Sequence, residues 1–341
     1  MTVAPLTPQA AADLPCPGVA EALGWTDAWQ TRHGDIWLIT REDGDTLVRR
    51  ADGTGQVVRF PDPTGDYRGY TTPAPGGTAF AVCGDSAVTL LDGEGNARWS
   101  HPHDPWSADN GSGRGACAFT ADGRHLIAVV PGTDTAGGYE GDVLVMLDSA
   151  TGAPAASHSL TAASAIYEIR QPFEGSGQLV VSAGQGQDDV LTYIAVFDGT
   201  TLHTTELDTK DEPVTDIDTT GRHLLTLERG GANLTLRTLG DDHLPTAERE
   251  LPVERLTEDE DQLFVGRPVL LGNSRILAAV ADEEWAEETR HFLIDAATLQ
   301  LLAEITYPRP AGPDIVPLPD SSWLTPDDDR LDHWHLDQPH P

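Results

Sequence analysis

Two histidine pairs are the residues whose type and spacing come closest to a metal-binding motif. The segment HPHDPW holds His101, His103 and Asp104 within four residues. Alternating histidines on an extended segment point the same way, and with Asp104 as an oxygen ligand they could bind Zn²⁺ or another divalent metal. His333 and His335 have the same spacing in DHWHLD. Packing within a strand, or a solvated loop, is the simpler interpretation of both pairs, so a divalent metal is the one cofactor we consider.

The motifs of covalent catalysis are missing. The chain has no G-x-S-x-G sequence, and neither Cys83 nor Cys117 has an identifiable base near it in the sequence. Both cysteines lie in small, apolar stretches typical of inner strands, which predicts that they are buried and structural. Cys16 makes three, an odd number without metal-ligand spacing, which argues against a disulfide framework. Whether the protein is an enzyme stays open on these grounds.

The chain is strongly acidic. Among its 341 residues, 55 are acidic and 21 are basic, for a formal net charge of -34. This charge repels a phosphate backbone, and the arginines are too scattered to form a basic patch, so we exclude nucleic acid as a partner. Lys210 is the single lysine, which indicates a GC-rich bacterial genome, such as that of an actinobacterium, or adaptation to salt. No signal-peptide pattern and no apolar run of about 20 residues is present, so we expect a cytoplasmic protein without a membrane partner.

An internal repeat explains why two phrases are nearly the same, FTADGRHLIAVV (119–130) and IDTTGRHLLTLE (217–228). In both, a turn precedes a short apolar run, and this pattern occurs seven times at intervals of 43 to 53 residues. Each run is too short and too rich in Val, Ile and Leu for a helix, which predicts a buried strand that is apolar on both faces. The residues at the equivalent buried position are Ile36, Ala79, Leu126, Leu179, Leu224, Ile276 and Trp323.

A second strand in each repeat ends at an aspartate turn. The aspartate carboxylate accepts a hydrogen bond from a backbone N–H two residues on, which suits a tight hairpin. With one strand before the apolar run and one after this turn, each repeat has four antiparallel strands, named A to D. Seven repeats of about 48 residues predict an all-β fold, the seven-bladed β-propeller. The turn aspartates are Asp52, Asp92, Asp148, Asp198 and Asp295, with weaker versions at Asp241 and Asp337.

Over roughly residues 26–337, the repeats resemble those of the WD40-like and quinoprotein-like β-propeller superfamily. FTADGRHLIAVV looks like its strand A, DGR turn and strand B, and LDSATG (147–152) looks like its strand C and the turn into strand D. Strict WD40 features are absent, because no repeat ends in Trp-Asp and none has Gly-His before strand A. Tryptophan-docking motifs for a quinone are also not evident. The resemblance therefore implies the fold and no cofactor, and such propellers include scaffolds, lyases, hydrolases and oxidoreductases.

Closure of the ring divides the chain into residues 1–25, a closing strand with a short helical segment, and residues 26–341, the propeller. The last repeat stops without a strand D. The apolar start MTVAPL is expected to supply it, with Thr2–Leu6 pairing along Leu331–Leu336. TPQAAADL (7–14) has a threonine N-cap and a proline at the first helical position, which predicts a helical turn outside the ring.

Charged residues on strand A are candidates for a site, because strand A borders the central channel and a propeller's channel mouth is the usual place for its ligand. These residues come from three consecutive repeats. Salt-bridged neighbours that only stabilise the ring are the alternative interpretation. The candidates are Glu168, Arg170, Asp216, Asp218 and Arg267.

Acidic residues concentrate in the connections from B to C and from D to A, which emerge on the same side of a propeller. About 30 of the 55 acids fall there. This bias predicts an acidic face that attracts a basic protein partner, or binds Ca²⁺ where several carboxylates converge. A solvated surface is the alternative. The acidic interaction face is expected to include Asp282, Glu283, Glu284, Asp327, Asp328 and Asp329.

Two functional hypotheses follow. The first is a scaffold, a protein–protein interaction module that binds through the acidic face. The second is a propeller enzyme, a metal-assisted hydrolase or lyase with its site at the channel mouth and with His101 and His103 among its working groups.

Overall fold

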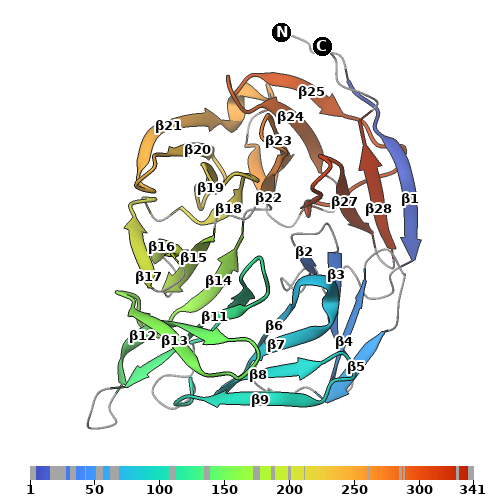
Figure 1. Ribbon diagram of the computed structural model, residues 1–341. Helices are drawn as coiled ribbons and strands as arrows, with labels where there is room; N and C mark the ends of the chain where they lie inside the picture. The colour runs from blue at the N-terminus through green and yellow to red at the C-terminus, as the bar shows by residue number, and fades with distance from the viewer. Residues whose placement is uncertain are drawn as a thin grey trace.

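The computed structural model describes residues 5–15, 28–30, 36–42, 44–50, 57–61, 69–106, 113–133, 139–171, 177–185, 189–198, 201–210, 212–259, 261–283, 286, 289–327 and 330–336. For residues 11–15, 28–30, 36, 41–42, 327 and 330 it describes the backbone alone. These residues form seven four-stranded antiparallel sheets arranged as blades around a common centre (Figure 1). The predicted seven-bladed β-propeller is confirmed.

The first three blades follow one another in the chain. In each blade the strands are given in order from the ring centre outward. Blade one consists of β2 (Ala28–Gln30), β3 (Ile36–Glu42), β4 (Asp45–Arg50) and β5 (Val58–Pro61). Blade two consists of β6 (Tyr70–Pro73), β7 (Ala79–Cys83), β8 (Ala87–Asp92) and β9 (Ala97–Pro102), with the short 3-10 helix η1 (Pro75–Gly77) between its first two strands. Blade three consists of β10 (Cys117–Phe119), β11 (His125–Thr133), β12 (Tyr139–Asp148) and β13 (Pro154–Ser159).

The remaining blades continue the same order around the ring. Blade four consists of β14 (Ile166–Arg170), β15 (Gln178–Gln185), β16 (Asp189–Phe197) and β17 (Leu202–Leu207). Blade five consists of β18 (Val214–Ile217), β19 (His223–Leu227), β20 (Asn233–Leu239) and β21 (Pro245–Pro252), and η2 (Val253–Arg255) leads out of it. Blade six consists of β22 (Leu263–Leu271), β23 (Arg275–Ala281), β24 (Arg290–Asp295) and β25 (Leu301–Ile305). Blade seven consists of β26 (Val316–Pro317), β27 (Trp323–Asp327), β28 (Arg330–His335) and, outermost, β1 (Gln9–Pro15).

The hydrophobic core lies between blades, because strand B of each blade is covered on both faces by its neighbours. One apolar cluster joins blades one and two, a larger one joins blades two to four, and others continue around the ring. Full burial of a side chain such as Leu126 or Ile276 contributes about 2 kcal/mol by transfer from water. Six of the seven predicted equivalent residues are at most 4% exposed, which confirms their burial; the side chain of the seventh, Ile36, lies outside the described residues. Cys83 and Cys117 are buried free thiols, as predicted.

The aspartate turns form as predicted in blades two and three. Asp92 Oδ1 accepts the backbone N–H of Glu94 at 3.0 Å, and Asp148 Oδ1 accepts that of Ala150 at 3.1 Å. Blade five departs from the prediction: Asp242 accepts the turn N–H of Leu244 at 3.2 Å. The carboxylate of its predicted turn residue, Asp241, forms an ion pair with Arg222. Asp198 and Asp295 also accept a turn bond, but from the N–H three residues on, at 2.8 and 2.7 Å, while Asp52 and Asp337 lie outside the described residues.

Ring closure uses the N-terminal chain, but through different residues from those expected. The closing strand is β1, whose Gln9 pairs with His335 and whose Pro15 pairs with Arg330 (Figure 1). The predicted pairing of Thr2–Leu6 is wrong, and so is the helical turn at 7–14. The physical reason is the open edge of β28: its backbone groups gain hydrogen bonds from β1, and this tertiary pairing outweighs the local helix propensity of the alanine run.

A second backbone contact fixes the N-terminal chain to blade six. Leu6 forms a parallel bridge with Ile305 of β25. Its N–H donates to Glu304 at 2.9 Å, and its carbonyl accepts the N–H of Thr306 at 2.8 Å. The closing segment therefore crosses from the rim of blade six to the rim of blade seven. Within the described residues, neither short helix is long and apolar enough to cross a membrane.

Candidate functional site

Strand A of blade four carries two charged side chains to the ring centre. Glu168 and Arg170 are two positions apart on β14 and so share a face of the strand. Arg170 Nη2 lies 3.2 Å from Glu168 Oε1. Arg267 of β22 donates to the same oxygen from Nη1 at 2.6 Å. Because blade five lies between blades four and six, this second ion pair crosses the ring centre, and the structure brings three of the five predicted channel residues together.

A backbone irregularity in β22 places Arg267. The pairing of β22 with β23 shifts register between Val265 and Val269, as at a β-bulge. Gly266 within this shift has φ +60, and a Cβ there would meet the carbonyl oxygen of Pro313 at 2.3 Å. Only glycine fits both the left-handed conformation and the close approach. The bulge thus sets Arg267 out of the regular ladder and beside the segment that contains Asp314.

Solvent reaches this cluster. The side chains of Arg267, Glu168 and Arg170 are 41%, 28% and 20% exposed. Burial alone would raise the pKa of Glu168, but the two guanidinium groups outweigh it and lower that pKa to about 2. Glu168 is therefore a fixed anion near neutral pH and is unsuited to donate a proton.

Two other carboxyl groups at the ring centre behave differently. Asp216, the fourth predicted channel residue, accepts the N–H of Leu270 at 2.7 Å and that of Ile217 at 2.8 Å, which ties blade five to blade six. Burial raises its pKa to about 6 in spite of these bonds and of Arg170. Asp314, in the connection from β25 to β26, also has a pKa raised by burial, with Arg267 opposing the shift. Asp314 was not predicted from the sequence because it lies outside strand A, in the connection that precedes the two-residue strand β26.

Asp218 serves a turn and does not join the Glu168 cluster. Its Oδ1 accepts the N–H of Arg222 at 2.8 Å and that of His223 at 3.1 Å, and its Oδ2 lies 2.9 Å from His223 Nδ1. Thr120 has the equivalent place in blade three, where its hydroxyl oxygen accepts the N–H of His125 at 3.1 Å. The carboxylate of Asp218 is therefore occupied by the turn between strands A and B.

The histidine pairs gain no support as metal sites. Among the described residues, no three His, Cys, Asp or Glu side chains form a group that could hold a metal ion. His103 Nδ1 donates to the backbone oxygen of Asp104 at 2.7 Å, and burial lowers the pKa of the ring, while His101 lies beside it on β9. His333 Nε2 lies 2.8 Å from the hydroxyl of Ser322, which fits packing within blade seven.

The acidic loop residues are described only in part. Asp282 and Glu283 are exposed at the start of the connection from β23 to β24. Glu284, Asp328 and Asp329 lie outside the described residues, as does the side chain of Asp327. Further exposed acids occur on the same B-to-C and D-to-A side of the ring, namely Asp104, Asp189, Asp208, Glu254, Glu258, Asp259 and Asp261.

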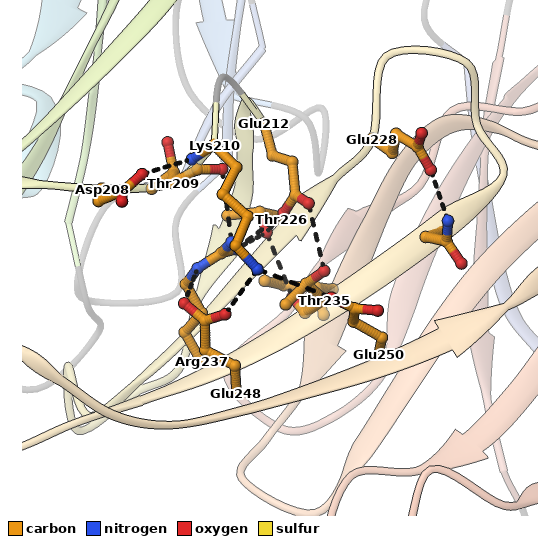
Figure 2. Close-up of polar contacts among 12 residues, drawn as sticks. Asp208, Thr209, Lys210, Glu212, Thr226, Glu228, Thr235, Arg237, Glu248 and Glu250 are labelled. Atoms are coloured by element: carbon orange, nitrogen blue, oxygen red, sulfur yellow. Dashed lines mark hydrogen bonds and ion pairs between the residues drawn. The ribbon is translucent and has the colours of Figure 1, made fainter.

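A buried charge network in blade five was not predicted from the sequence. Arg237 on β20 is fully buried, and Figure 2 shows its guanidinium among carboxylates and hydroxyls. Its Nη1 lies 2.8 Å from Glu212, and its Nε lies 3.2 Å from Glu248. Thr226 donates to Glu212 at 2.6 Å and accepts from Arg237. Glu212 precedes β18, so this network ties the crossover from blade four onto blade five.

A second unpredicted network holds the crossover from blade six to blade seven. Trp323 Nε1 donates to the hydroxyl of Tyr307 at 2.9 Å, and that hydroxyl lies 2.8 Å from His291 Nδ1. His291 Nε2 lies 3.0 Å from the carbonyl oxygen of Gly312, which can only accept, so Nε2 carries the proton. His291 is therefore a neutral, fully hydrogen-bonded imidazole with a structural role.

Comparison with known proteins supports the fold and goes no further. No family model matches the chain, and no curated protein sequence matches it. Among solved structures, a chain of Kuenenia stuttgartiensis hydrazine synthase is similar over 96% of this chain and 97% of that one, with 12% identity and a TM-score of 0.56. Dihydro-heme d1 dehydrogenase NirN in complex with DHE is similar over 87% of this chain and 59% of that one, with 15% identity and a TM-score of 0.52. A third chain, BBS1N in complex with ARL6DN, gives a TM-score of 0.49 at 13% identity over 98% and 94% of the two chains. At these identities the likeness concerns the β-propeller fold alone.

Proposed function

We propose that this protein is a WD40-like β-propeller that acts as a protein–protein interaction module and binds a basic partner through its B-to-C and D-to-A face. One observation supports this proposal above others: exposed acids gather on that face around blade six. Glu258, Asp259, Asp261, Asp282 and Glu283 are exposed there, and among the described residues only Asp259 of these five has an ion-pair partner, Arg290 at 2.9 Å. Unpaired carboxylates raise the local negative potential and speed encounter with a cationic surface.

The antiparallel order of strands supports grouping these residues. Each blade runs A, B, C, D from the centre outward, so chain direction reverses three times and the B-to-C and D-to-A connections leave the ring on the same side. Carboxylates from several connections therefore act on one approaching partner. A rigid ring positions them without a large entropic cost on binding.

The test compares two variants with equal charge loss on opposite sides of the ring. The face variant carries Glu258→Gln, Asp261→Asn, Asp282→Asn and Glu283→Gln. The control variant carries Glu94→Gln, Asp122→Asn, Asp241→Asn and Asp242→Asn, all at exposed positions of the A-to-B and C-to-D connections. Each protein is immobilised and challenged with lysate of its host at about 0.05 M and about 0.5 M salt.

We expect a partner that the original protein and the control variant retain at low salt, and that the face variant loses. High salt should release the partner from all three proteins, because screening shortens the reach of exposed charges. A partner that the face variant retains as well as the control, or that ignores salt, would show that the acids are only a solvated surface.

The alternative hypothesis, an enzyme with its site at the ring centre, is favoured by one observation. Charged side chains from blades four to six converge there, with Asp314 from the connection into blade seven, and burial raises the pKa of Asp216 to about 6. The cluster contains no nucleophile activated by a neighbouring base, and the metal group that this hypothesis needs does not form among the described residues. The interaction module is therefore the better supported function.

A further inference from the structure

The ring centre contains one guanidinium whose hydrogen-bonding edge is unused. Arg267 donates to Glu168 through Nη1 only, at 2.6 Å. Its Nε and Nη2 donate to no protein atom in the described part of the chain, and its side chain is 41% exposed. These two nitrogens form the edge of a guanidinium that binds carboxylate or phosphate oxygens in a bidentate manner.

The surroundings hold this edge in place. Glu168 fixes the guanidinium from one side, and the Gly266 bulge fixes the backbone that carries it. Arg170 shares the same Glu168 oxygen and adds a second positive charge, and its Nε is buried without a hydrogen-bond partner among the described residues. Glu168 thus holds two guanidinium groups. Their unused N–H donors keep a fixed position because the ion pairs and the bulge are rigid.

Two carboxyl groups oppose an incoming anion unless they carry protons. Asp216 interacts with Arg170, and Asp314 interacts with Arg267. Burial already raises the pKa of both groups, and a bound anion would raise it further. Among the described residues, other ionisable groups nearby are Glu168, which is paired, and Asp218, whose carboxylate accepts turn N–H groups. Tyr70 also lies nearby, and burial and Glu168 raise its pKa well above the ordinary value, so that it stays neutral. An anion would therefore bind together with a proton.

We propose that the ring centre binds a small oxyanion, a carboxylate or a phosphate group, on the free Nε and Nη2 edge of Arg267 with proton uptake at the Asp314 carboxyl. The proton comes from solvent, and no covalent bond in the ligand changes. This site uses none of the exposed acids that the interaction proposal rests on, so it is tested independently of the proposed interaction function.

The experiment is calorimetric titration of the full-length protein with succinate and, separately, with inorganic phosphate at pH 6. Each titration is run in two buffers that differ in ionisation enthalpy, and sodium chloride of matched ionic strength is the reference. We expect saturable binding of at least one probe with a Kd of about 1 mM or tighter, and a buffer-dependent heat that reports proton uptake. The stronger probe identifies the chemistry as carboxylate or phosphate.

Variants assign the site. Arg267→Lys keeps the charge but removes the bidentate edge, and should weaken binding by about tenfold or more. Asp314→Asn should retain binding and take up fewer protons than the original protein, with the remaining uptake at Asp216. Arg98→Gln on the exposed rim strand β9 is the matched control and should change neither. Melting temperatures of all variants show whether each is folded.

Three outcomes would overturn the proposal. The first is that neither probe gives saturable heat beyond the sodium chloride reference. The second is that folded Arg267→Lys binds as tightly as the original protein. The third is that binding releases or takes up no proton in either buffer.

Discussion

Glu168 Oε1 lies 2.6 Å from Nη1 of Arg267, and this contact connects blade four to blade six across the ring centre. The same oxygen lies 3.2 Å from Arg170. One carboxylate oxygen therefore holds two guanidinium groups that would otherwise repel each other. Since neighbouring blades are already joined by their apolar faces, this ion pair adds a connection between blades that are not neighbours.

Glu168→Gln should destabilise the ring because it leaves two cations without their shared counter-ion. Burial of an unpaired charge is costly, but the side chains here keep 28% and 41% of their surface exposed, so solvent screens part of the effect. We expect a loss of about 1 to 2 kcal/mol in the free energy of unfolding, measured by urea denaturation at pH 7. Glu94→Gln on an exposed turn is the control and should change stability by less than about 0.5 kcal/mol. Equal stability of both variants would mean that the ion pair contributes nothing to the fold.

Arg237→Gln should be more damaging than any substitution at the ring centre. Arg237 is fully buried, and its loss leaves Glu212 without the cation that it contacts at 2.8 Å, while Glu248 keeps the exposed Lys210 at 3.1 Å. Removal of one partner from a buried pair typically costs about 3 to 5 kcal/mol. The measurement is the same urea denaturation.

A double substitution tests whether this cost comes from the pair. Arg237→Gln with Glu212→Gln removes both charges, so it should cost clearly less than the sum of the two single substitutions. Additive losses would show that the two side chains act independently, in contradiction to the 2.8 Å contact between them.

The sequence predicts the ring and its blades because the same pattern, a turn followed by a short apolar strand, occurs seven times. Burial at Leu126, Leu224 and Ile276 follows from one physical requirement, a strand covered on both faces by neighbouring blades. Turn aspartates are equally predictable, since their bonds reach only two or three residues along the chain. The local signals for strands and turns agree with the repeat, so an error at one position does not change the predicted fold.

Long-range polar contacts could not be predicted in the same way. Arg237 occurs within an alternating strand, where a charged residue usually indicates an exposed position; its burial depends on Glu212, which reaches it from the crossover between blades. The contact of Glu168 with Arg267 joins residues 99 positions apart in the chain, and although a lone glycine in a strand is typical of a bulge, Gly266 does not indicate which residue Arg267 contacts. The closing strand was misplaced because helix propensity is local, while the open edge of β28 exists only after the ring has formed.

Two truncations should separate the two backbone contacts of the N-terminal chain. Deletion through Leu6 removes the bridge to Ile305 and leaves β1 intact, so we expect a decrease in Tm of a few degrees. Deletion through Pro15 also exposes the edge of β28, and should lower Tm much further and promote association through that edge. The measurements are thermal unfolding and light scattering. If the two truncations have the same Tm, β1 does not contribute to closure.

Protonation of His291 should make the protein less stable in mildly acidic solution. Burial lowers the pKa of His291 from its ordinary 6.5 to about 4, although the bond to Gly312 opposes the shift. Above about pH 6.5 the imidazole is neutral in both states and its contribution to stability is complete. Between about pH 6.5 and pH 4, His291 binds a proton in the unfolded chain but not in the folded chain. The free energy of unfolding therefore falls by about 3 kcal/mol in total.

The test of this pH dependence is the difference in unfolding free energy between the original protein and His291→Gln, which cannot titrate. At pH 7 the variant should be the less stable of the two, because glutamine cannot reproduce both bonds, to Tyr307 and to Gly312. That gap should shrink steadily as pH falls from 6.5 to 4, since only the original protein loses the His291 contribution.

The comparison must be made as a difference because Asp216 acts in the opposite direction: burial raises its pKa to about 6, so its protonation favours the folded state as pH falls. Asp216→Asn supplies the matching control, and its stability relative to the original protein should decrease as pH falls over the same range. A gap for His291→Gln that stays constant between pH 7 and pH 4 would mean that His291 titrates normally in the folded protein.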